Sequence, residues 1–407
     1  MAESTAARRW TDADFARRAR NRGDAELNAI LAGAPPGVLS LMGGFPNPAT
    51  FPADALDELV AALLRDDPAG ALQYAPVEGI PSVREFLLDR QEQLQGRRPE
   101  APELIVTSGG MECIALACQA LIDPGDAVVV EAPTYLGALM AFAGVEADVH
   151  GIEMDEDGMR VDLLEERLAG GLRPKLVYVI PEFQNPSGRT LSLPRRHELV
   201  ELCRRYGVLI LEDVAYREIA FDDGAAPPSL WSLAPDVVVQ AGTFSKIFCP
   251  GVRLGWAAGP VDVIAQMAAA KQTTDQCAGG LGQRIVEAYG RAGHFERRIP
   301  GARALYASHW RAVERALREH MPARCVWSEP AGGFFTWLSL PGIDTVAMRP
   351  AALDAGVAYV PGVPFCPDSG GRSELRLSFS FLGEDELETA VARLAGVVAR
   401  ATSTAAG

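Results

Sequence analysis

The chain is organised around the stretch Thr243-Phe244-Ser245-Lys246-Ile247-Phe248-Cys249-Pro250-Gly251-Val252-Arg253-Leu254-Gly255. Apolar runs flank it, Val237-Val238-Val239 before it and Trp256-Ala257-Ala258 after it, and such runs predict buried strands. Lys246 therefore lies between two elements of a predicted core, where an ammonium group without a partner is costly. A lysine in this place either extends to the surface or carries chemistry.

The residues around Lys246 favour a chemical role. Hydroxyl groups precede it at Thr243 and Ser245, and Arg253 follows it after a Pro-Gly turn. Hydroxyls and an arginine together suit a phosphate dianion. Burial beside other cations lowers the pKa of a lysine and makes it a nucleophilic amine. The stretch thus suggests pyridoxal phosphate bound through a Schiff base, and the alternative is a polar turn with an exposed lysine.

Earlier apolar runs alternate with helical segments and define the fold class. These runs cover residues 104–106, 127–130, 176–180 and 208–211. Continuous β-branched runs separated by helices indicate a mostly parallel sheet that is covered on both faces, which is the α/β class. Ligands of such sheets bind beyond the carboxyl ends of the strands. The residues directly after each run are therefore candidates for a site.

The first two runs lead into glycines and an aromatic residue. Gly109-Gly110-Met111 opens a predicted helix, whose free backbone N–H groups can hold phosphate, although a simple N-cap by Ser108 explains the same pattern. Tyr135 follows the second run and can stack on an aromatic ligand or fill the core.

The next two runs lead into an amide and a carboxylate. Asn185 can donate to a ligand oxygen or simply start an Asn-Pro turn. Asp213 ends a predicted buried strand, so it needs a cation, and a protonated pyridine nitrogen is one. Tyr216 lies close enough in sequence to reach a neighbouring ring oxygen.

Two loops near the N-terminus are further candidates. Gly44 follows a short apolar strand, and its turn either exposes N–H groups to a carboxylate or is a plain surface turn. Tyr74 lies in a Gly- and Pro-bounded loop that interrupts the helical region 52–95. It is either a ligand or interface residue or an ordinary packing residue.

The last hundred residues change to an α+β pattern and predict a smaller second domain. Predicted helices at 271–297 and 302–320 lead into it, and Arg376 lies in a short strand at 374–379. Arg376 faces water or forks onto a carboxylate in a cleft. We expect an N-terminal arm at 1–50, a large domain at 51–300 and a small domain at 301–407.

The bulk composition excludes several classes of function. The 407 residues are 48% hydrophobic and 22% charged, as in ordinary globular proteins, and carry a formal net charge of −15. An acidic chain lacks the basic face that nucleic acid needs. No apolar run has the length of a membrane span, and the Arg-rich start lacks the apolar core of a signal peptide. We therefore expect a cytoplasmic protein with no membrane partner.

Metal and nucleotide sites are not expected either. The seven cysteines are odd in number, scattered and without a C-x-x-C pair. The five histidines form no H-E-x-x-H motif, and the chain has no P-loop and no G-x-G-x-x-G.

Taken in order, these motifs resemble the class I and II aminotransferases of pyridoxal phosphate fold type I, over residues 25–400. The most similar branch holds 2-aminoadipate aminotransferases and the effector domains of MocR-type regulators. The resemblance implies that Lys246, in Ser245-Lys246-x-x-x-Pro250-Gly251-x-Arg253-x-Gly255, is the Schiff-base lysine and that Asp213 holds the pyridine nitrogen. The implied phosphate ligands are Thr243, Ser245, Arg253, Gly109, Gly110 and Met111. The implied ring and substrate contacts are Asn185 and Tyr216 to the phenolic oxygen, Tyr135 stacked on the ring, and Arg376 with Gly44 at the substrate carboxylate.

The resemblance also implies the reaction. It predicts transfer of an amino group between an L-α-amino acid and a 2-oxo acid with ping-pong kinetics, in a homodimer where Tyr74 reaches the cofactor phosphate of the partner's site. The same scaffold supports lyase, decarboxylase and oxidase reactions, which remain the alternative. A ligand-sensing regulator is disfavoured, because too few residues precede Gly43 for a winged helix.

The sequence departs from the branch at two places. Ser-Gln often follows the phosphate-loop glycine, whereas here the pair is Gly110-Met111. Related enzymes for acidic substrates carry an arginine on the early helix, where this chain has Asn28. Glu26 and Glu182 are candidate acidic groups near the pocket. We therefore expect a polar or basic substrate side chain rather than an acidic one.

Overall fold

A computed structural model describes residues 10–20, 28, 30, 33–222, 224, 226–368 and 370–405. Their centre is an eight-stranded sheet with strand order β2-β9-β8-β7-β6-β3-β4-β5. The strands are β2 (Leu104–Thr107), β3 (Ala127–Ala132), β4 (Asp148–Asp155), β5 (Gly158–Met159), β6 (Leu176–Val179), β7 (Leu209–Asp213), β8 (Val238–Thr243) and β9 (Gly255–Ala258). Every predicted apolar run forms a strand here, and β4, β3, β6, β7 and β8 are parallel neighbours. The predicted α/β class is confirmed.

The stretch that contains Lys246 joins β8 to β9. Its residues 244–254 are too few for a crossover helix, so β9 returns antiparallel to β8 and pairs with β2 on its other side. Thr243 ends β8 as Asp213 ends β7, in neighbouring parallel strands. The turn with Lys246 therefore lies at the same edge of the sheet as Asp213.

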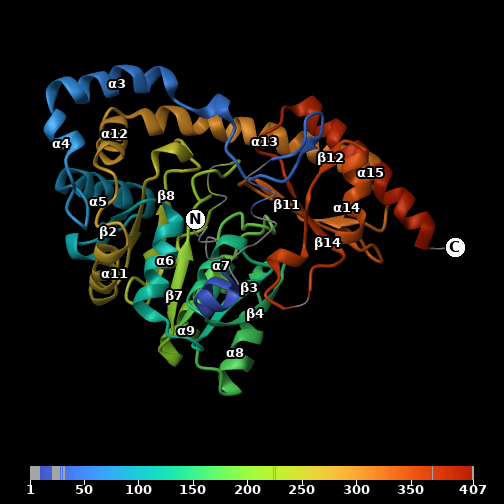
Figure 1. Ribbon diagram of the computed structural model, residues 1–407, viewed down its shortest axis with the longest axis horizontal. Helices are drawn as coiled ribbons and strands as arrows, with labels where there is room; N and C mark the ends of the chain where they lie inside the picture. The colour runs from blue at the N-terminus through green and yellow to red at the C-terminus, as the bar shows by residue number, and fades with distance from the viewer. Residues whose placement is uncertain are drawn as a thin grey trace, which may run out of the picture.

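Helices bury both faces of this sheet (Figure 1). One face packs against α5 (Pro81–Gln95), α8 (Val161–Ala169), α9 (Leu193–Tyr206), α10 (Leu230–Leu233) and α12 (Gly280–Arg291). The other packs against α6 (Gly110–Leu121), α7 (Leu136–Gly144) and α11 (Val261–Thr274). Successive residues alternate between the two cores, as Val177 and Tyr178 do, because a strand points its side chains to opposite faces.

A smaller sheet lies beside the large one. Its order is β10 (Val326–Trp327), β11 (Phe335–Ser339), β14 (Glu374–Ser378) and β13 (Val360–Pro361), all antiparallel. Its core contains residues of α14 (Thr345–Asp354) and α15 (Glu384–Ala405). β1 (Leu39–Ser40) pairs with β12 (Val357–Ala358), so the N-terminal arm joins this part of the molecule.

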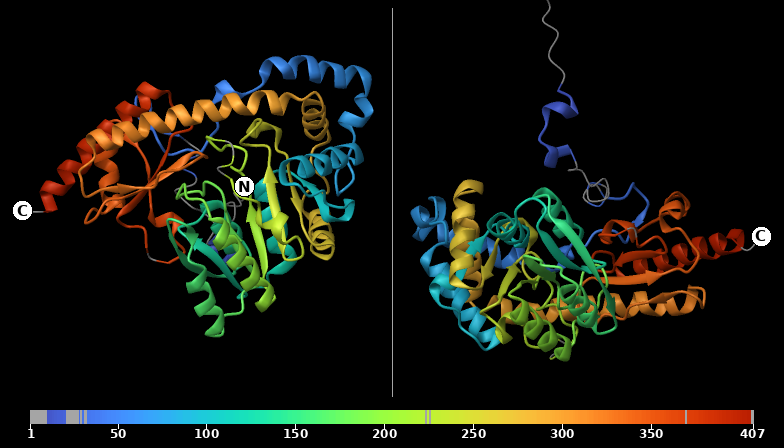
Figure 2. Two further views of the ribbon diagram at one scale, coloured as in Figure 1. Left: turned by 180° about the vertical axis from the view of Figure 1, so that it is seen from behind. Right: turned by 90° about the horizontal axis from the view of Figure 1, so that it is seen from below.

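The long helix α13 (His294–His320) spans the two parts, as Figures 1 and 2 show. Phe295 packs in a core of the large sheet and Leu317 in the core of the small one. The boundary that we predicted after residue 300 falls inside this helix, and the division into domains stays a prediction.

The remaining helices differ from the prediction at one place, residues 271–297. α1 (Arg17–Arg20), α3 (Ala53–Asp66) and α4 (Pro68–Leu72) precede the large sheet, and short 3-10 turns cover Asp12–Asp14, Pro48–Thr50, Ala101–Glu103, Pro250–Val252 and Val363–Phe365. The helix predicted at 271–297 is wrong: α11 ends at Thr274, and Gly293, with φ of 70°, separates α12 from α13. Glycine takes this left-handed conformation without strain, so it favours a break. Among the described residues, no helix combines the length and the apolar character needed to cross a membrane.

Candidate active site

Residues from both sheets and the N-terminal arm line one cavity of about 320 Å³. The predicted residues among them are Gly44, Gly110, Met111, Tyr135, Asn185, Asp213, Tyr216, Thr243, Ser245, Lys246, Arg253 and Arg376. Two predicted residues do not line it: Gly109, which lies next to Arg253, and Tyr74, which is 82% exposed in the loop after α4.

Asp213 is a buried carboxylate at the end of β7. Its Oδ2 accepts a hydrogen bond from the Tyr178 hydroxyl at 2.9 Å, and its Oδ1 accepts one from the backbone N–H of Ala215 at 3.1 Å. Burial raises the pKa of Asp213 to about 6, and the bond from Tyr178 limits the rise. The group therefore keeps a negative charge at neutral pH and suits a cationic ring nitrogen.

Lys246 faces the same cavity from the turn after β8. Its Nζ donates to the carbonyl oxygen of Gly44 at 2.9 Å. Burial lowers the pKa of Lys246 to about 8, with Asp213 opposing the shift and the cations Arg376 and Arg253 adding to it. A fraction of the amine is therefore neutral near pH 7, which a nucleophile or a base requires.

Arg376 and Asn185 form a buried pair on the side of the smaller sheet. Nη1 of Arg376 donates to Oδ1 of Asn185 at 2.8 Å, and its Nη2 donates to the Met42 carbonyl. The guanidinium carbon lies 4.4 Å from the ring centre of Phe335 and 4.8 Å from that of Phe365. The aromatic rings hold the fork in place, and a planar fork suits a carboxylate.

Asn185 also contacts the hydroxyl of Tyr216. Because the amide oxygen of Asn185 faces Arg376, its Nδ2 group is the donor in the hydrogen bond with Tyr216. The ring of Tyr216 lies 5.9 Å from Nζ of Lys246. An amide and a phenol thus lie together near the lysine, where they can donate to a ring oxygen.

A second group of donors gathers at the start of α6. Gly109 is the N-cap of this helix and Gly110 its first residue, so the N–H groups of Gly110 and Met111 have no partner within the helix. Nη1 of Arg253 lies 3.5 Å from Oγ of Ser245, which also accepts from Thr243 at 3.0 Å. A helix start with a guanidinium and two hydroxyls is a donor set for a phosphate dianion.

The backbone of this turn leaves no room for larger residues. A Cβ atom on Gly109 would lie 2.9 Å from Nη2 of Arg253, and one on Gly255 would lie 2.9 Å from Cα of Gly109. The sequence pattern Pro-Gly-x-Arg-x-Gly therefore serves the close approach of the arginine to the helix start.

Tyr135 is the N-cap residue of α7 and lies beside the cavity. A Cβ atom on Gly137 would lie 2.5 Å from its ring, so the glycine makes room for the ring. Burial raises the pKa of Tyr135 to about 12, which keeps its hydroxyl neutral. The neutral ring is free to contact an aromatic ligand.

Our prediction from the sequence did not include Tyr178, the buried residue whose hydroxyl donates to Asp213. The feature that could have identified it is a hydroxyl group inside the apolar run at 176–180, because a buried tyrosine hydroxyl usually has a hydrogen-bond partner. The apolar part of the cavity wall was missed too. It includes Ile30, Phe45, Ile114, Leu136, Phe335 and Phe365.

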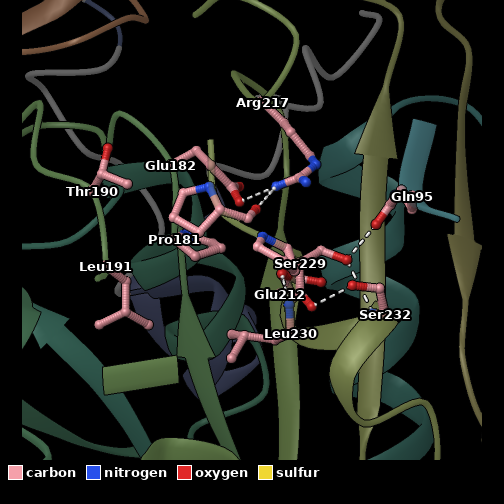
Figure 3. Close-up of polar contacts among 12 residues, drawn as sticks. Gln95, Pro181, Glu182, Thr190, Leu191, Glu212, Arg217, Ser229, Leu230 and Ser232 are labelled. Carbon is pink, nitrogen blue, oxygen red and sulfur yellow. Dashed lines mark hydrogen bonds and ion pairs between the residues drawn. The ribbon is translucent and has the colours of Figure 1, made fainter. Parts of the chain in front are cut away.

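Glu182 is a correction to our expectation of an acidic group in the pocket. It does not line the cavity, and its buried Oε1 accepts from Nη1 of Arg196 at 2.7 Å and of Arg217 at 2.5 Å. Figure 3 shows Arg217 reaching Glu182. Nearby, Glu212 accepts from the backbone N–H of Leu230 at 2.7 Å. The arginines neutralise Glu182, so it presents no charge to a ligand. Glu26, the other candidate, lies outside the described residues.

The sequence contains three lysines, and all lie in the described part of the chain. Lys175 is exposed at the amino end of β6, 3.5 Å from Asp126. Lys271 is buried in ion pairs with Glu112 and Asp275. Lys246 is the one of the three that lines the cavity.

The residues present fit pyridoxal phosphate, the group that the sequence suggests. A phosphate donor set, an amine, a carboxylate for a ring nitrogen and donors for a ring oxygen all face one cavity. Each partner matches one functional group of that molecule in charge.

Comparison with known proteins gives the family. The profile described as aminotransferase class I and II matches residues 47–394. The aromatic-amino-acid aminotransferase 1 of Thermococcus litoralis is 38% identical over 367 residues, which cover 89% of this chain and 88% of that protein.

Solved structures agree over nearly the whole chain. The multiple substrate aminotransferase of Thermococcus profundus matches with a TM-score of 0.92 and 35% identity, covering 97% of this chain and 99% of that one. The α-aminoadipate aminotransferase of Thermus thermophilus, complexed with N-(5′-phosphopyridoxyl)-L-leucine, matches with a TM-score of 0.89 and 32% identity, covering 96% and 98%.

Proposed function

This chain belongs to the class I and II aminotransferases, and on that premise we propose that it moves an amino group between an L-α-amino acid and a 2-oxo acid by a ping-pong mechanism. Its cofactor is pyridoxal 5′-phosphate. The observation that carries the proposal is the shared cavity, which Lys246, Asp213 and Arg376 all line.

We assign the binding of the cofactor to two groups of residues. When bound, pyridoxal phosphate supplies an aldehyde that condenses with amines and a ring that accepts an electron pair from the substrate α-carbon. The N–H groups of Gly109, Gly110 and Met111 hold its phosphate, together with Thr243, Ser245 and Arg253. Tyr135 covers the ring, and Asn185 with Tyr216 donates to the ring oxygen.

Two residues hold or move protons. Asp213 keeps a proton on the ring nitrogen, because its carboxylate is ionised at neutral pH and is fixed by Tyr178. Lys246 lines the cavity, and its lowered pKa would supply a neutral amine that can take and hold the proton of the substrate α-carbon. The same residue would serve both half-reactions, because the second runs the first in reverse with a different 2-oxo acid.

Arg376 binds the α-carboxylate of the substrate. Its fork is fixed between two aromatic rings and Asn185, so it is oriented before the substrate arrives. The backbone of Gly44 lies close by, since its carbonyl already contacts Lys246. Pre-orientation lowers the entropy that binding costs.

We propose that the substrate side chain is bulky and apolar or aromatic. The expected polar or basic preference depended on Glu182 and Glu26. Glu182 does not line the cavity, whereas Ile30, Leu136 and Phe365 do. The aromatic substrates in the name of the Thermococcus litoralis relative and the leucine adduct of the Thermus thermophilus structure support this choice.

We also propose a homodimer. Tyr74 is strongly exposed and outside its own cavity, and Leu72 near it is exposed as well. Aromatic residues are enriched in protein interfaces, so the exposure of Tyr74 beside Leu72 supports burial of this loop against a second subunit. In the proposed dimer, Tyr74 completes the partner subunit's phosphate site.

The function is tested with a panel of amino acids added singly to the enzyme loaded with pyridoxal phosphate. We expect phenylalanine, tyrosine and leucine to convert the absorbance to that of pyridoxamine phosphate faster than aspartate or lysine does. A 2-oxo acid must then restore the original spectrum. Release of ammonia or consumption of oxygen without this reversal would instead identify a lyase or an oxidase. Fast conversion by lysine or aspartate would reject the apolar preference alone.

A further inference from the structure

A fully buried lysine lies outside the cavity. Lys271, in α11, is 0% exposed, and its Nζ donates to Oε2 of Glu112 at 2.7 Å and to Oδ1 and Oδ2 of Asp275 at 2.7 and 2.8 Å. An ammonium group has three N–H donors, and these contacts use all of them. The lysine thus joins α11 to the first turn of α6, which contains Glu112.

Both carboxylates also bind Ser108. Oε2 of Glu112 accepts from the backbone N–H of Ser108 at 2.6 Å, and Oδ2 of Asp275 accepts from its hydroxyl at 2.8 Å. The carbonyl oxygen of Ser108 accepts from Nη2 of Arg253 at 3.1 Å. Every polar group of Ser108 is therefore bound, and this residue directly precedes the Gly109-Gly110 turn.

Lys271 also compensates part of the negative charge of Glu112 and Asp275. Burial raises the pKa of Glu112, and Lys271 opposes the rise. Hydrogen bonds from Lys271 help to hold the pKa of Asp275 below its usual range, although burial opposes them. Glu112 and Asp275 also lie within hydrogen-bonding reach of each other, so without the lysine two acidic groups would adjoin a helix start that suits an anion, and neighbouring like charges repel.

We propose that Lys271 is a positioning residue for the cofactor phosphate. Its single positive charge pairs with both Glu112 and Asp275, and these side chains in turn hold Ser108 so that the N–H groups of the following turn point at the phosphate. Lys271 does not contact the cofactor. The inference depends on the proposed cofactor site but not on which amino acid is the substrate.

The test compares two probes, pyridoxal phosphate and pyridoxal, which lacks the phosphate. Apo-protein is titrated with each, and binding is followed by absorbance and by quenching of tryptophan fluorescence. The variant Lys271→Met removes the charge and keeps the length of the side chain. Lys175→Met is the matched control, because that lysine is exposed and distant from the turn.

We expect Lys271→Met to weaken pyridoxal phosphate binding by about tenfold and to leave pyridoxal binding unchanged. The double variant Lys271→Met with Glu112→Gln should regain most of the affinity, because it removes one of the two facing charges. The phosphorus-31 signal of the bound cofactor should shift in the single variant and return in the double one. Lys175→Met should match the wild type in every measurement.

Three results would overturn the proposal. One is an equal loss for both probes, which indicates a general packing role, and another is no loss for either probe. The third is a double variant as weak as the single one. If Lys271→Met does not fold, the variant Ser108→Ala, at a half-buried site, replaces it. This variant must weaken pyridoxal phosphate binding, by less than tenfold, and leave pyridoxal binding unchanged. A folded wild type that fails to bind pyridoxal phosphate would reject the proposed function itself.

Discussion

Burial moves the pKa values of Lys246 and Asp213 toward each other, to about 8 and about 6. Each charge costs free energy in the buried site, and each opposes the loss of the other, because Asp213 raises the pKa of Lys246. At neutral pH, Asp213 is therefore mostly charged, and a fraction of Lys246 is a neutral amine that can react. Separate pKa values for an acid and a base within one site are typical of proton transfer at neutral pH.

The lowered pKa of Lys246 predicts how fast the apo-protein captures pyridoxal phosphate. The neutral amine is the reactive form, and its fraction rises about tenfold per pH unit below the pKa. The capture rate should rise to about pH 8 and then level off, because the pKa lies near 8 instead of 10.5. Stopped-flow absorbance measures this rate. A rate that still rises steeply between pH 9 and pH 10 would contradict the assignment.

The identity of the lysine is checked by reduction with borohydride and peptide mass mapping. With three lysines in the sequence, the adduct has three possible positions. Lys246→Ala should lose the adduct, and Lys175→Ala should keep it, since Lys175 is exposed and far from the cavity.

The contacts of Arg376 predict how much the enzyme loses when this side chain is removed. Arg376→Ala removes the fork and leaves the amide oxygen of Asn185 without the donor that Arg376 supplied, so kcat/KM for amino acids should fall by an amount equal to about 2–5 kcal/mol. Steady-state kinetics measure it. The matched control is Arg372→Ala, an exposed arginine four residues earlier that pairs with Asp344 and should leave the kinetics unchanged. A wild-type KM in Arg376→Ala would exclude the carboxylate role.

The helix start at Gly109, where we propose that the phosphate binds, depends on a conformation that suits glycine. The residue has φ of 107°, which residues with a side chain rarely adopt, and a Cβ atom placed on it would meet the guanidinium of Arg253. The glycine conformation and the close approach serve the same end, because they bring a guanidinium to the N–H groups at the start of α6.

Two glycines with almost the same φ separate these effects. Gly171, with φ of 104°, has nothing within 4 Å of its missing Cβ, whereas Gly109 faces Arg253. Both alanine variants should lose about 1–3 kcal/mol of unfolding free energy from the backbone alone. Only Gly109→Ala should also bind pyridoxal phosphate more weakly, because its methyl group displaces Arg253. Chemical denaturation and cofactor titration measure the two losses. Equal cofactor affinity in both variants would refute the close approach.

The elements that the sequence predicted share one property: each follows from a local pattern. Asn185 and Asp213 directly follow apolar runs, so their place at the strand ends could be inferred from topology rules alone. β4 was missed because it lies toward the sheet edge, where a strand such as Asp148–Asp155 needs no continuous apolar run.

Features that depend on residues far apart in the chain could not be predicted from the sequence. From the sequence alone, Glu182 is a charged residue in a turn. Its ion pairs with Arg196 and Arg217 depend on other elements that bring these arginines to it. The link from Tyr178 to Asp213 crosses two neighbouring strands and depends on their register. Pairing of this kind is decided by tertiary structure, so a single sequence does not reveal it.

At the scale of the whole molecule, the cavity depends on two sheets and one long helix. Lys246 and Asp213 come from the large sheet, Arg376 from the small one, and α13 packs against both cores. The N-terminal arm closes the set, since Met42 and Gly44 bind Arg376 and Lys246 through their carbonyl groups. Separate folding of either part would leave the site incomplete.

The proposed dimer predicts complementation between two inactive proteins. Tyr74→Ala and Lys246→Ala should each be nearly inactive. If Tyr74 acts in the partner subunit, mixed dimers formed by unfolding and refolding together contain one site with both defects and one intact site. Activity should then return in the mixture, while each protein refolded alone stays inactive. A mixture as inactive as its components, with dimers seen by ultracentrifugation, would place Tyr74 in its own subunit's site.

The three lysines have a further consequence for spectroscopy. Lys246 lies in the cavity, Lys271 in a buried ion cluster and Lys175 at the surface. Protein grown with lysine labelled at the side-chain nitrogen alone would therefore give three signals, each from a different environment. The first would follow the covalent state of the cofactor, the second the support of its phosphate, and the third would serve as an internal reference. One labelled sample would thus report on both ends of the cofactor without any substitution.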